Sequence, residues 1–231
     1  MATLLLRLAG PLQSWGYESK FETRRTLGFP TKSGVIGLLA AALGYSRDEP
    51  LDRLNSLRFG IRADYEGKLL RDYHTAKGKK DKDMYITNRY YLSDAIFLVG
   101  VESDDEAFIK ELEYALCHPA FPLFLGRRSC PPTMPLVLGT REEFLLPALQ
   151  NEPWLLPLWR QKTLLNKNDN KLRIITDSDV DDPDSSIRDI PVSFSRTYRK
   201  FKWRSVCDHG YIEMKAQENL TEHDAFSEVG E

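Results

Sequence analysis

Two stretches near the start of the chain decide the fold: Leu4–Gly16 reads LLLRLAGPLQSWG, and Phe29–Gly44 reads FPTKSGVIGLLAAALG. The apolar run Thr3–Leu8 ends shortly before a Gly-Pro pair, which predicts a short buried strand. Ser33–Leu43 predicts a helix, because Thr31 and the serine of this range are both candidate N-caps and a glycine follows the last leucine. This helix has almost no polar face, so we expect other elements to cover it.

The following residues continue the alternation of strand and helix patterns. Leu57–Ala63 alternates apolar and polar residues and Ala95–Val101 is an apolar run, so both are predicted strands. Asp104–Cys117 is amphipathic and acidic at its start, which predicts a helix. Asp72–Met84 is polar and predicts a long exposed loop, followed by the strand-like Tyr85–Leu92. With one more strand near residue 123 or 136, the order becomes βαββαβ, which predicts an α+β protein with an RRM or ferredoxin-like architecture.

After residue 120 the chain is punctuated by prolines and its pattern changes. Arg141–Trp154 predicts a helix broken at Pro147. Leu172–Thr176 and Val192–Trp203 predict strands. The acidic stretch between them, Asp177–Asp184, lacks the glycine and the final glutamate of an EF-hand, so we expect a solvated loop there. The residues from about 218 onward are acidic, and we expect them to fray.

The composition is typical of a globular protein in a reducing compartment. Apolar residues make up 42% of the chain and charged residues 29%, and no apolar run is long enough to cross a membrane. No leader peptide is visible, and three widely spaced cysteines do not form a disulfide framework, so we expect a cytoplasmic protein. The net charge of −2 hides alternating acidic and basic blocks, and such local basic surfaces suit a polyanionic partner.

The sequence contains no complete catalytic or metal-binding motif. Gly28–Ser33 precedes a helix but lacks the second glycine of a phosphate-binding loop, so it predicts a capped helix or a non-catalytic anion site at its lysine and serine. The cysteines and histidines lack the spacing of a zinc site, so no metal and no cofactor are expected. His74, beside Tyr73 and Lys77, could support acid–base cleavage of RNA, although an exposed loop residue is the simpler interpretation.

Three segments combine cations with aromatic residues or glycine: Lys20–Arg25, Gly126–Arg128 and Arg196–Arg204. The last contains five cations and three aromatic residues in nine positions, without an acid. In one extended strand, its even-numbered positions form a cationic face that carries Tyr198, while the other face can pack on a core. Such a ridge suits phosphate groups, and a charged edge strand that resists aggregation is the alternative interpretation.

The motifs of the N-terminal half resemble the CasD subunit family, the Cas-five group, of CRISPR Cascade complexes. The resemblance rests on GPLQSWG at 10–16, on FETRRT at 21–26 and on PTKSGVIG at 30–37. LGRRSCPP at 125–132 points to the type I-E branch of the family. The similarity runs from the N-terminus to about Arg141 and extends to the basic segment Arg196–Arg204.

The resemblance implies an RRM-like domain over residues 1–140, with a thumb inserted at about 72–92, and a smaller β-rich region over 141–231 with an acidic tail. It implies a non-enzymatic subunit of the Cascade ribonucleoprotein in antiviral defence. This subunit holds the 5′ handle of CRISPR RNA and docks against a backbone subunit and the large subunit. Target DNA is reached only through the complex, and no membrane partner is implied. The thumb implied by the family coincides with the polar loop, which we expect to be disordered in the isolated protein.

A second branch of the family, in type I-C systems, cleaves the precursor RNA without a metal, using a Tyr, a Lys and a His. In this chain His118 stands between Cys117 and Pro119, so the Lys-His pair of that branch is missing. A metal-independent endoribonuclease that processes precursor CRISPR RNA is therefore the alternative to the binding subunit.

The candidate RNA-binding residues belong to the N-terminal motifs, the thumb and the basic segments, and no catalytic or metal-ligating residue is expected. In the thumb, lysines that include Lys82 are expected to reach phosphates, while Met84 and Tyr85 pack against a partner. The full set is Gln13, Ser14, Arg24, Arg25, Lys32, Ser33, Tyr73, His74, Lys77, Lys79, Lys80, Met84, Arg127, Arg128, Arg196, Arg199, Lys200, Lys202 and Arg204.

Overall fold

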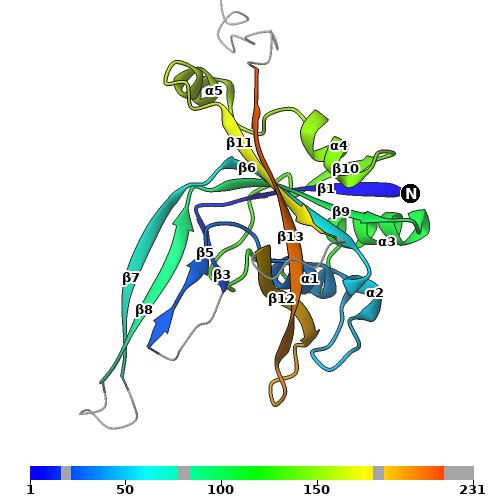
Figure 1. Cartoon of the computed structure of the whole chain (residues 1–231). Coiled ribbons are helices and arrows are strands. Elements are labelled where there is room, and N and C mark those ends of the chain that lie inside the picture. Colours follow the sequence, from blue (N-terminus) through cyan, green and yellow to red (C-terminus); the bar gives the residue numbers. More distant parts are fainter. Residues whose placement is uncertain (17–21, 78–83, 179–184, 216–231) are drawn as a thin grey trace, which may run out of the picture.

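The protein is an α+β protein built around one seven-stranded antiparallel sheet (Figure 1). The computed structural model describes residues 1–16, 22–77, 84–178 and 185–215. The strands of the sheet follow one another in the order β10-β1-β9-β6-β11-β13-β12. Their bounds are β1 Ala2–Ala9, β6 Arg58–Tyr65, β9 Ile96–Ser103, β10 Val137–Arg141, β11 Lys171–Asp177, β12 Ser186–Ser193 and β13 Lys200–Glu213.

The first half of the sheet contains the strands and helices that the N-terminal pattern predicted. Helix α1 (Lys32–Leu43) lies in the chain between β1 and β6, and α3 (Glu106–Cys117) lies between β9 and β10. Thr31 caps α1 by accepting from the Gly34 N–H at 3.2 Å, and Gly44 ends the helix in the left-handed conformation. Among the described residues, α1 has seven buried positions, so its expected burial is confirmed. The short α2 (Asp52–Asn55) joins α1 to β6.

The central strands β1 and β9 are buried on both faces of the sheet. Leu4, Leu6 and Leu8 of β1 pack in the large core beneath α1 and α3, whereas Leu5 points into a second cluster with Leu149. That second cluster lies under α4 (Leu145–Asn151), on the other side of the sheet (Figure 1). This arrangement explains why the predicted first strand is apolar at almost every position instead of alternating. Within the described ranges, no helix has the length and apolar character needed to cross a membrane.

The residues after β10 continue the same sheet from its β6 edge. Strand β11 pairs with β6 through Ile174–Thr176, and β13 then pairs with β11 and β12. The single strand expected over Val192–Trp203 is wrong, because the chain turns between Ser193 and Lys200, which pair with each other. The helix expected over 141–154 is shorter than predicted, and Pro147 does not break it. A proline in the first turn removes only an N–H that has no partner within the helix. Helix α5 (Leu158–Leu165) was not predicted.

A long hairpin projects from the main sheet between β6 and β9 (Figure 1). Strand β7 (Lys68–Lys77) pairs with β8 (Met84–Ser93) in an unbroken antiparallel register. The loop predicted for Asp72–Met84 is therefore wrong over its first half, as is its expected disorder there, since a ladder with β8 satisfies the backbone of these polar residues. Two short strands, β2 (Leu12–Gln13) and β4 (Thr23–Arg24), also pair with β8. Lys79, Lys80, Lys82 and the acidic tail lie outside the described residues.

A fully buried ion pair fastens the chain after α4 to strand β6. Arg62 donates to both carboxylate oxygens of Asp64 at 2.7 and 2.9 Å, and to the carbonyl oxygens of Leu149, Glu152 and Pro153. Asp64 also accepts from the Leu155 N–H at 2.8 Å. Burial raises the pKa of Asp64, and the positive charge of Arg62 opposes this shift. The guanidinium thus satisfies a buried carboxylate and three backbone carbonyls at the end of α4 and directly after it.

Arg62→Met is expected to lower the free energy of unfolding by roughly 3–5 kcal/mol, since it leaves a buried charge without its partner. The loss should grow with pH. Without the opposing charge the pKa of Asp64 rises further in the folded state. When the pKa of a carboxyl group is higher in the folded state than in the unfolded state, the free energy of unfolding falls as pH rises above the unfolded-state pKa, which is about 3.9 for aspartate. Urea unfolding at about pH 5 and about pH 8 measures the difference. The double variant with Asp64→Asn removes the charge and should flatten this dependence; an equal loss at both pH values in the single variant contradicts this explanation.

Candidate nucleic-acid interface

A cleft of about 920 Å³ runs alongside α1, from its first turn to the segment that follows its last residue. It is lined by residues 14–16, Arg24, α1 with the segment 45–47, the loop 121–131, and residues 194–201 in and beside the turn between β12 and β13. The cleft therefore brings together segments that are up to about 185 residues apart in the chain, and both halves of the main sheet contribute to it. Six of the candidate residues line it: Ser14, Arg24, Ser33, Arg127, Arg128 and Arg199.

The cleft carries positive charge without acidic neighbours. Its lining includes five arginines, and no aspartate, glutamate or histidine is among the described residues that line it. Within the described ranges, none of these arginines takes part in an ion pair. Aromatic side chains stand among them, with Phe121 half exposed at 51%. A surface that mixes unpaired guanidinium groups with aromatic rings suits a single-stranded polyanion, because phosphates meet the cations and bases stack on the rings. The five arginines are Arg24, Arg47, Arg127, Arg128 and Arg199.

The loop that carries two of these arginines is held close against the first segment of the cleft. Ser14 donates its N–H to the Leu125 carbonyl at 3.1 Å, and Leu125 donates to the Cys130 carbonyl at 2.7 Å. Gly126 adopts a left-handed backbone with φ of 83°. A Cβ atom at this position would lie 1.9 Å from the Ser14 carbonyl oxygen. Glycine is therefore required both for the turn and for the close approach.

Arg127 is part of the loop's support as well as of its charge. Its guanidinium lies 4.7 Å from the ring centre of Tyr91 and donates to the Arg24 carbonyl at 2.9 Å. The second terminal nitrogen, Nη1, is buried and makes no hydrogen bond to the described residues. Arg128, by contrast, is exposed. The two neighbouring arginines thus differ: one is stacked in place and the other extends into solvent at the cleft.

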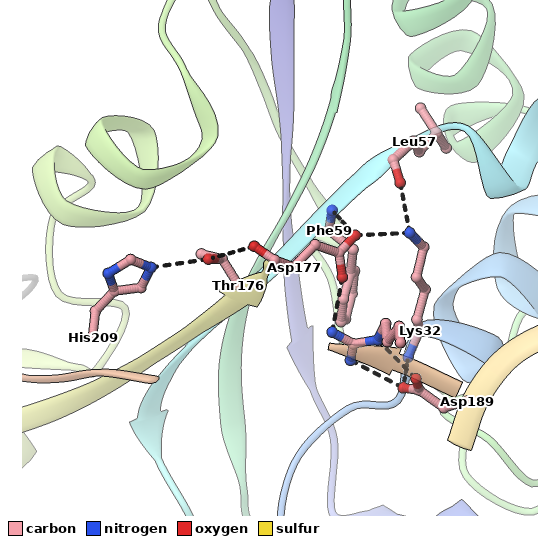
Figure 2. A network of polar contacts seen from close by, with 8 residues as sticks. Lys32, Leu57, Phe59, Thr176, Asp177, Asp189 and His209 are labelled. Atoms are coloured by element: carbon pink, nitrogen blue, oxygen red, sulfur yellow. Dashed lines mark hydrogen bonds and ion pairs between the residues drawn. The ribbon is translucent and has the colours of Figure 1, made fainter. Parts of the chain in front are cut away.

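The start of α1 is already occupied by protein groups, which corrects the expectation for Lys32. Asp189 of β12 accepts from the Lys32 N–H at 2.7 Å, so a carboxylate of the chain itself fills the anion position at this helix end. The Lys32 ammonium is buried and donates to Asp177 at 2.7 Å and to the Leu57 carbonyl at 2.8 Å (Figure 2). Lys32 is therefore a structural residue in this fold, and not an exposed cation.

Arg204 is corrected in the same way, since it is the other cation of this network. It donates to Asp189 at 2.7 and 3.1 Å and to Asp177 at 2.8 Å, and only 8% of the residue is exposed. Asp177 also accepts from the Phe59 N–H at 3.0 Å, and its carbonyl accepts from Thr176, whose hydroxyl meets His209 (Figure 2). The solvated acidic loop expected from Asp177 onward is therefore wrong at its first residue, because Asp177 is bound by Lys32 and Arg204.

Gln13 is also an internal residue. Its amide donates to the Leu8 and Ala95 carbonyls at 3.0 and 2.7 Å, and its oxygen accepts from the Trp15 indole. Trp15 is completely buried, and a Cβ atom on Gly34 would lie 2.7 Å from its ring. The glycine therefore makes room for the tryptophan. Ser14 is buried but lines the cleft, and its hydroxyl donates to the Tyr90 carbonyl at 3.1 Å.

The remaining candidates among the described residues are spread over three further places. Arg196, Lys200 and Lys202 lie in and after the β12–β13 turn, outside the cleft lining, so the single cationic face predicted for Arg196–Arg204 does not form. Arg25 is exposed between β4 and β5 (Thr26–Leu27), a strand that pairs with β3 (Trp15–Gly16). On the hairpin, Tyr73 and His74 are exposed on β7, and Lys77 pairs with Met84 at the last described register position.

Arg47 is a cleft residue that no pattern in the sequence indicates. It follows α1 in the segment SRDEP. The two acids after it cancel its charge when charges are summed along the sequence, so this segment does not stand out as basic. Glu49 of this segment is already engaged, since it accepts from the Ser46 N–H at 2.6 Å. The aromatic residues Tyr45, Phe194 and Phe201 were missed for a related reason, because their positions in the cleft depend on the tertiary fold.

Gly126→Ala is expected to destabilise the protein by roughly 1–3 kcal/mol, because the left-handed backbone is strained and the methyl group meets the Ser14 carbonyl. Thermal unfolding measures the effect. Gly28→Ala is the matched control, since a Cβ atom there meets nothing within 4 Å and should leave stability nearly unchanged. Equal melting temperatures for the two variants would show that the loop does not depend on this close approach.

Comparison with known proteins gives consistent matches over most of the chain. The family described as CRISPR-associated protein (Cas_Cas5) matches residues 3–207. The CRISPR system Cascade subunit CasD of Escherichia coli (strain K12) is 43% identical over 157 residues, which cover 59% of this chain and 70% of that protein. A chain in the structure of a CRISPR RNA-guided surveillance complex superposes with a TM-score of 0.73 at 31% identity, covering 92% of this chain and 90% of that one. A crystal structure of a Cas protein superposes with a TM-score of 0.69 at 38% identity, covering 90% and 94% of the two chains. Together with the motifs at 10–16 and 30–37, these matches show that the chain belongs to the Cas5 family of CRISPR-associated proteins.

Proposed function

We propose that this protein is the CasD-type subunit of a type I-E Cascade complex, and that it binds the 5′ handle of CRISPR RNA without cleaving it. In this role it docks against a backbone subunit and the large subunit in the cytoplasm, and it meets target DNA only through the assembled complex. The relative named Cascade subunit CasD and the likeness to a chain of an RNA-guided surveillance complex support the assembly.

The observation that carries the proposal is the cleft beside α1, with five arginines and no carboxylate among its described lining residues. Phosphates of a single strand can contact the exposed guanidinium groups of Arg24, Arg128 and Arg199. Bases can stack on rings such as that of Phe121. Lys32, Arg204 and Gln13 are left out of this interface, because their polar groups already bind other parts of the chain.

The strand order supports an RRM or ferredoxin-like module as the base of this site. The neighbours β10-β1-β9-β6 are all antiparallel, with α1 and α3 as the two crossover connections. This is the arrangement that a βαββαβ chain produces when its first and third strands lie in the middle of the sheet. We infer that residues 1–140 form this module and that the region from 141 extends it by β11, β12 and β13.

The positions of the histidines favour binding over RNA cleavage. His118 stacks on Tyr114 at the end of α3, with ring centres 4.5 Å apart. His74 is exposed on the hairpin. Neither lines the cleft, so no imidazole among the described lining residues is in place to transfer a proton to RNA held there.

The hairpin is proposed to be a second contact with RNA and with a neighbouring subunit. Its described part exposes large apolar side chains that the isolated chain leaves in water: Leu69 at 65%, Tyr73 at 59% and Tyr85 at 63%. Exposed apolar surface of this kind on a projecting element is typical of an interaction surface. Because β7 and β8 are already paired, binding of the hairpin to a partner would cost less conformational entropy than binding of a disordered loop would.

Replacing Arg24 and Arg128 together by Ala is expected to weaken binding of single-stranded repeat RNA and to flatten its salt dependence. For a single strand, removing one phosphate contact reduces the slope of log K against log salt concentration by about 0.7. Fluorescence anisotropy over a salt series measures the slope. Lys110→Ala, an exposed cation on α3 outside the cleft, is the charge-matched control. An unchanged slope in the double variant removes these arginines from the interface, and cleavage of repeat RNA by the pure protein in EDTA would favour the endoribonuclease instead.

Shortening the hairpin is expected to impair assembly while preserving the fold. Thr75 and Ile86 are register partners, so residues 76–85 can be replaced by a two-residue Asn-Gly turn. The pairing of residues 68–75 with 86–93 is then kept, together with the hydrogen bond between Arg71 and Asn88. Co-purification with CRISPR RNA and the other Cascade subunits measures assembly, and thermal unfolding checks the fold. Wild-type yield of the complex with full target-DNA binding would show that the hairpin is not an assembly element.

A further inference from the structure

We propose that Arg47 and Arg199 together bind one phosphate group of the RNA in the cleft. This inference rests on the proposed function and adds to it a site that the sequence motifs do not contain. The two arginines come from different halves of the fold: Arg47 follows α1, and Arg199 lies in the turn that leads into β13. Both line the same cleft and both are exposed.

No carboxylate in the described structure neutralises either side chain. Neither arginine forms an ion pair with another described residue. The aspartates at the start of α1, Asp177 and Asp189, are both bound by Arg204. The guanidinium of Arg199 instead lies 5.4 Å from the ring centre of Phe201, another cleft residue, which limits the directions in which it can point.

The two guanidinium groups belong to one cleft, where their like charges repel each other. Loss of solvent around its guanidinium lowers the pKa of Arg199, and repulsion from the positive charge of Arg47 lowers it further. Repulsion between like charges is unfavourable in the free protein. An anion placed between them would remove that repulsion and gain two charge-assisted contacts.

The chemistry that fits this pair is a tetrahedral phosphate. The planar guanidinium group presents parallel N–H donors that match two oxygens of a phosphate, and two such groups can hold different oxygens of the same phosphorus centre. A phosphodiester within the strand and a phosphate at its 5′ end share this chemistry. They differ in charge and in whether the strand continues beyond the pair.

The test is a double-mutant cycle on RNA binding with the full-length chain. Arg47→Ala, Arg199→Ala and the double variant are compared with wild type, using a short single-stranded repeat RNA with a 5′-hydroxyl, by fluorescence anisotropy at constant salt. Each single variant is expected to bind about tenfold more weakly, as for a contact to a charged group. The double variant should lose clearly less than the product of the two single losses, because the arginines share one ligand. Losses that multiply fully would show two independent contacts and overturn the inference.

A second arm identifies the phosphate. The same RNA carrying a 5′-phosphate binds wild type more tightly than the hydroxyl form if the pair holds the chain end, and the gain disappears in either variant. Equal coupling with both RNAs assigns an internal phosphodiester. Arg47→Lys and Arg199→Lys keep the positive charge but remove the paired N–H donors of the guanidinium group. A partial loss of RNA affinity in both variants supports phosphate binding through paired donors.

Controls separate this inference from the proposed function. Lys110→Ala should bind as wild type, and unchanged thermal unfolding of the variants shows that the fold is intact. If wild type fails to bind the RNA, the proposed function itself is wrong. If wild type binds and the Arg24/Arg128 double variant weakens, but Arg47 and Arg199 variants bind normally, only the shared phosphate site is wrong.

Discussion

The fold depends on a buried network in which two cations and two carboxylates from distant parts of the chain meet. Lys32 stands at the start of α1, Asp177 at the end of β11, Asp189 in β12 and Arg204 in β13 (Figure 2). The charges balance, and each carboxylate also accepts a backbone N–H, from Phe59 or from Lys32. Removing one partner would leave a buried charge without compensation, so the contributions of the four side chains to stability depend on one another. Their geometry fixes where the C-terminal strands lie relative to α1.

The cleft follows from that constraint. Its arginines come from segments before and after β10, and only the joining of β12 and β13 to the α1 side places Arg199 opposite the loop that carries Arg128. The same network also binds the two carboxylates at the start of α1. Asp177 and Asp189 are engaged by internal cations, which leaves the exposed arginines without acidic partners among the described residues. Basic side chains that look alike in the sequence therefore divide into those that hold the fold and those that face solvent.

Local patterns predicted the elements whose stability is encoded nearby. The apolar runs predicted β1 and β9, the expected cap Thr31 marks the start of α1, and the acidic start predicted for the next helix coincides with the first turn of α3. The predictions were wrong where residues distant in the sequence determine the local structure or the burial of a side chain. The polar residues 72–77 form a strand because β8 lies beside them, and Arg204 is buried because Asp189, 15 positions away, lies across a strand pair. For the site, the GRR loop was predicted to bind RNA and lines the cleft, whereas Arg47 could not be recognised, since it stands beside two acids in the sequence and only the tertiary fold brings it to the cleft.

Strand β8 has a mechanical consequence. At one end it forms half of the projecting hairpin, and at the other its Tyr90 carbonyl receives the Ser14 hydroxyl while the Tyr91 ring supports Arg127. The projecting hairpin and the edge of the cleft are thus connected through the continuous backbone of one strand. A partner that displaced the hairpin would therefore act, through the backbone of β8, on the groups that position Ser14 and Arg127.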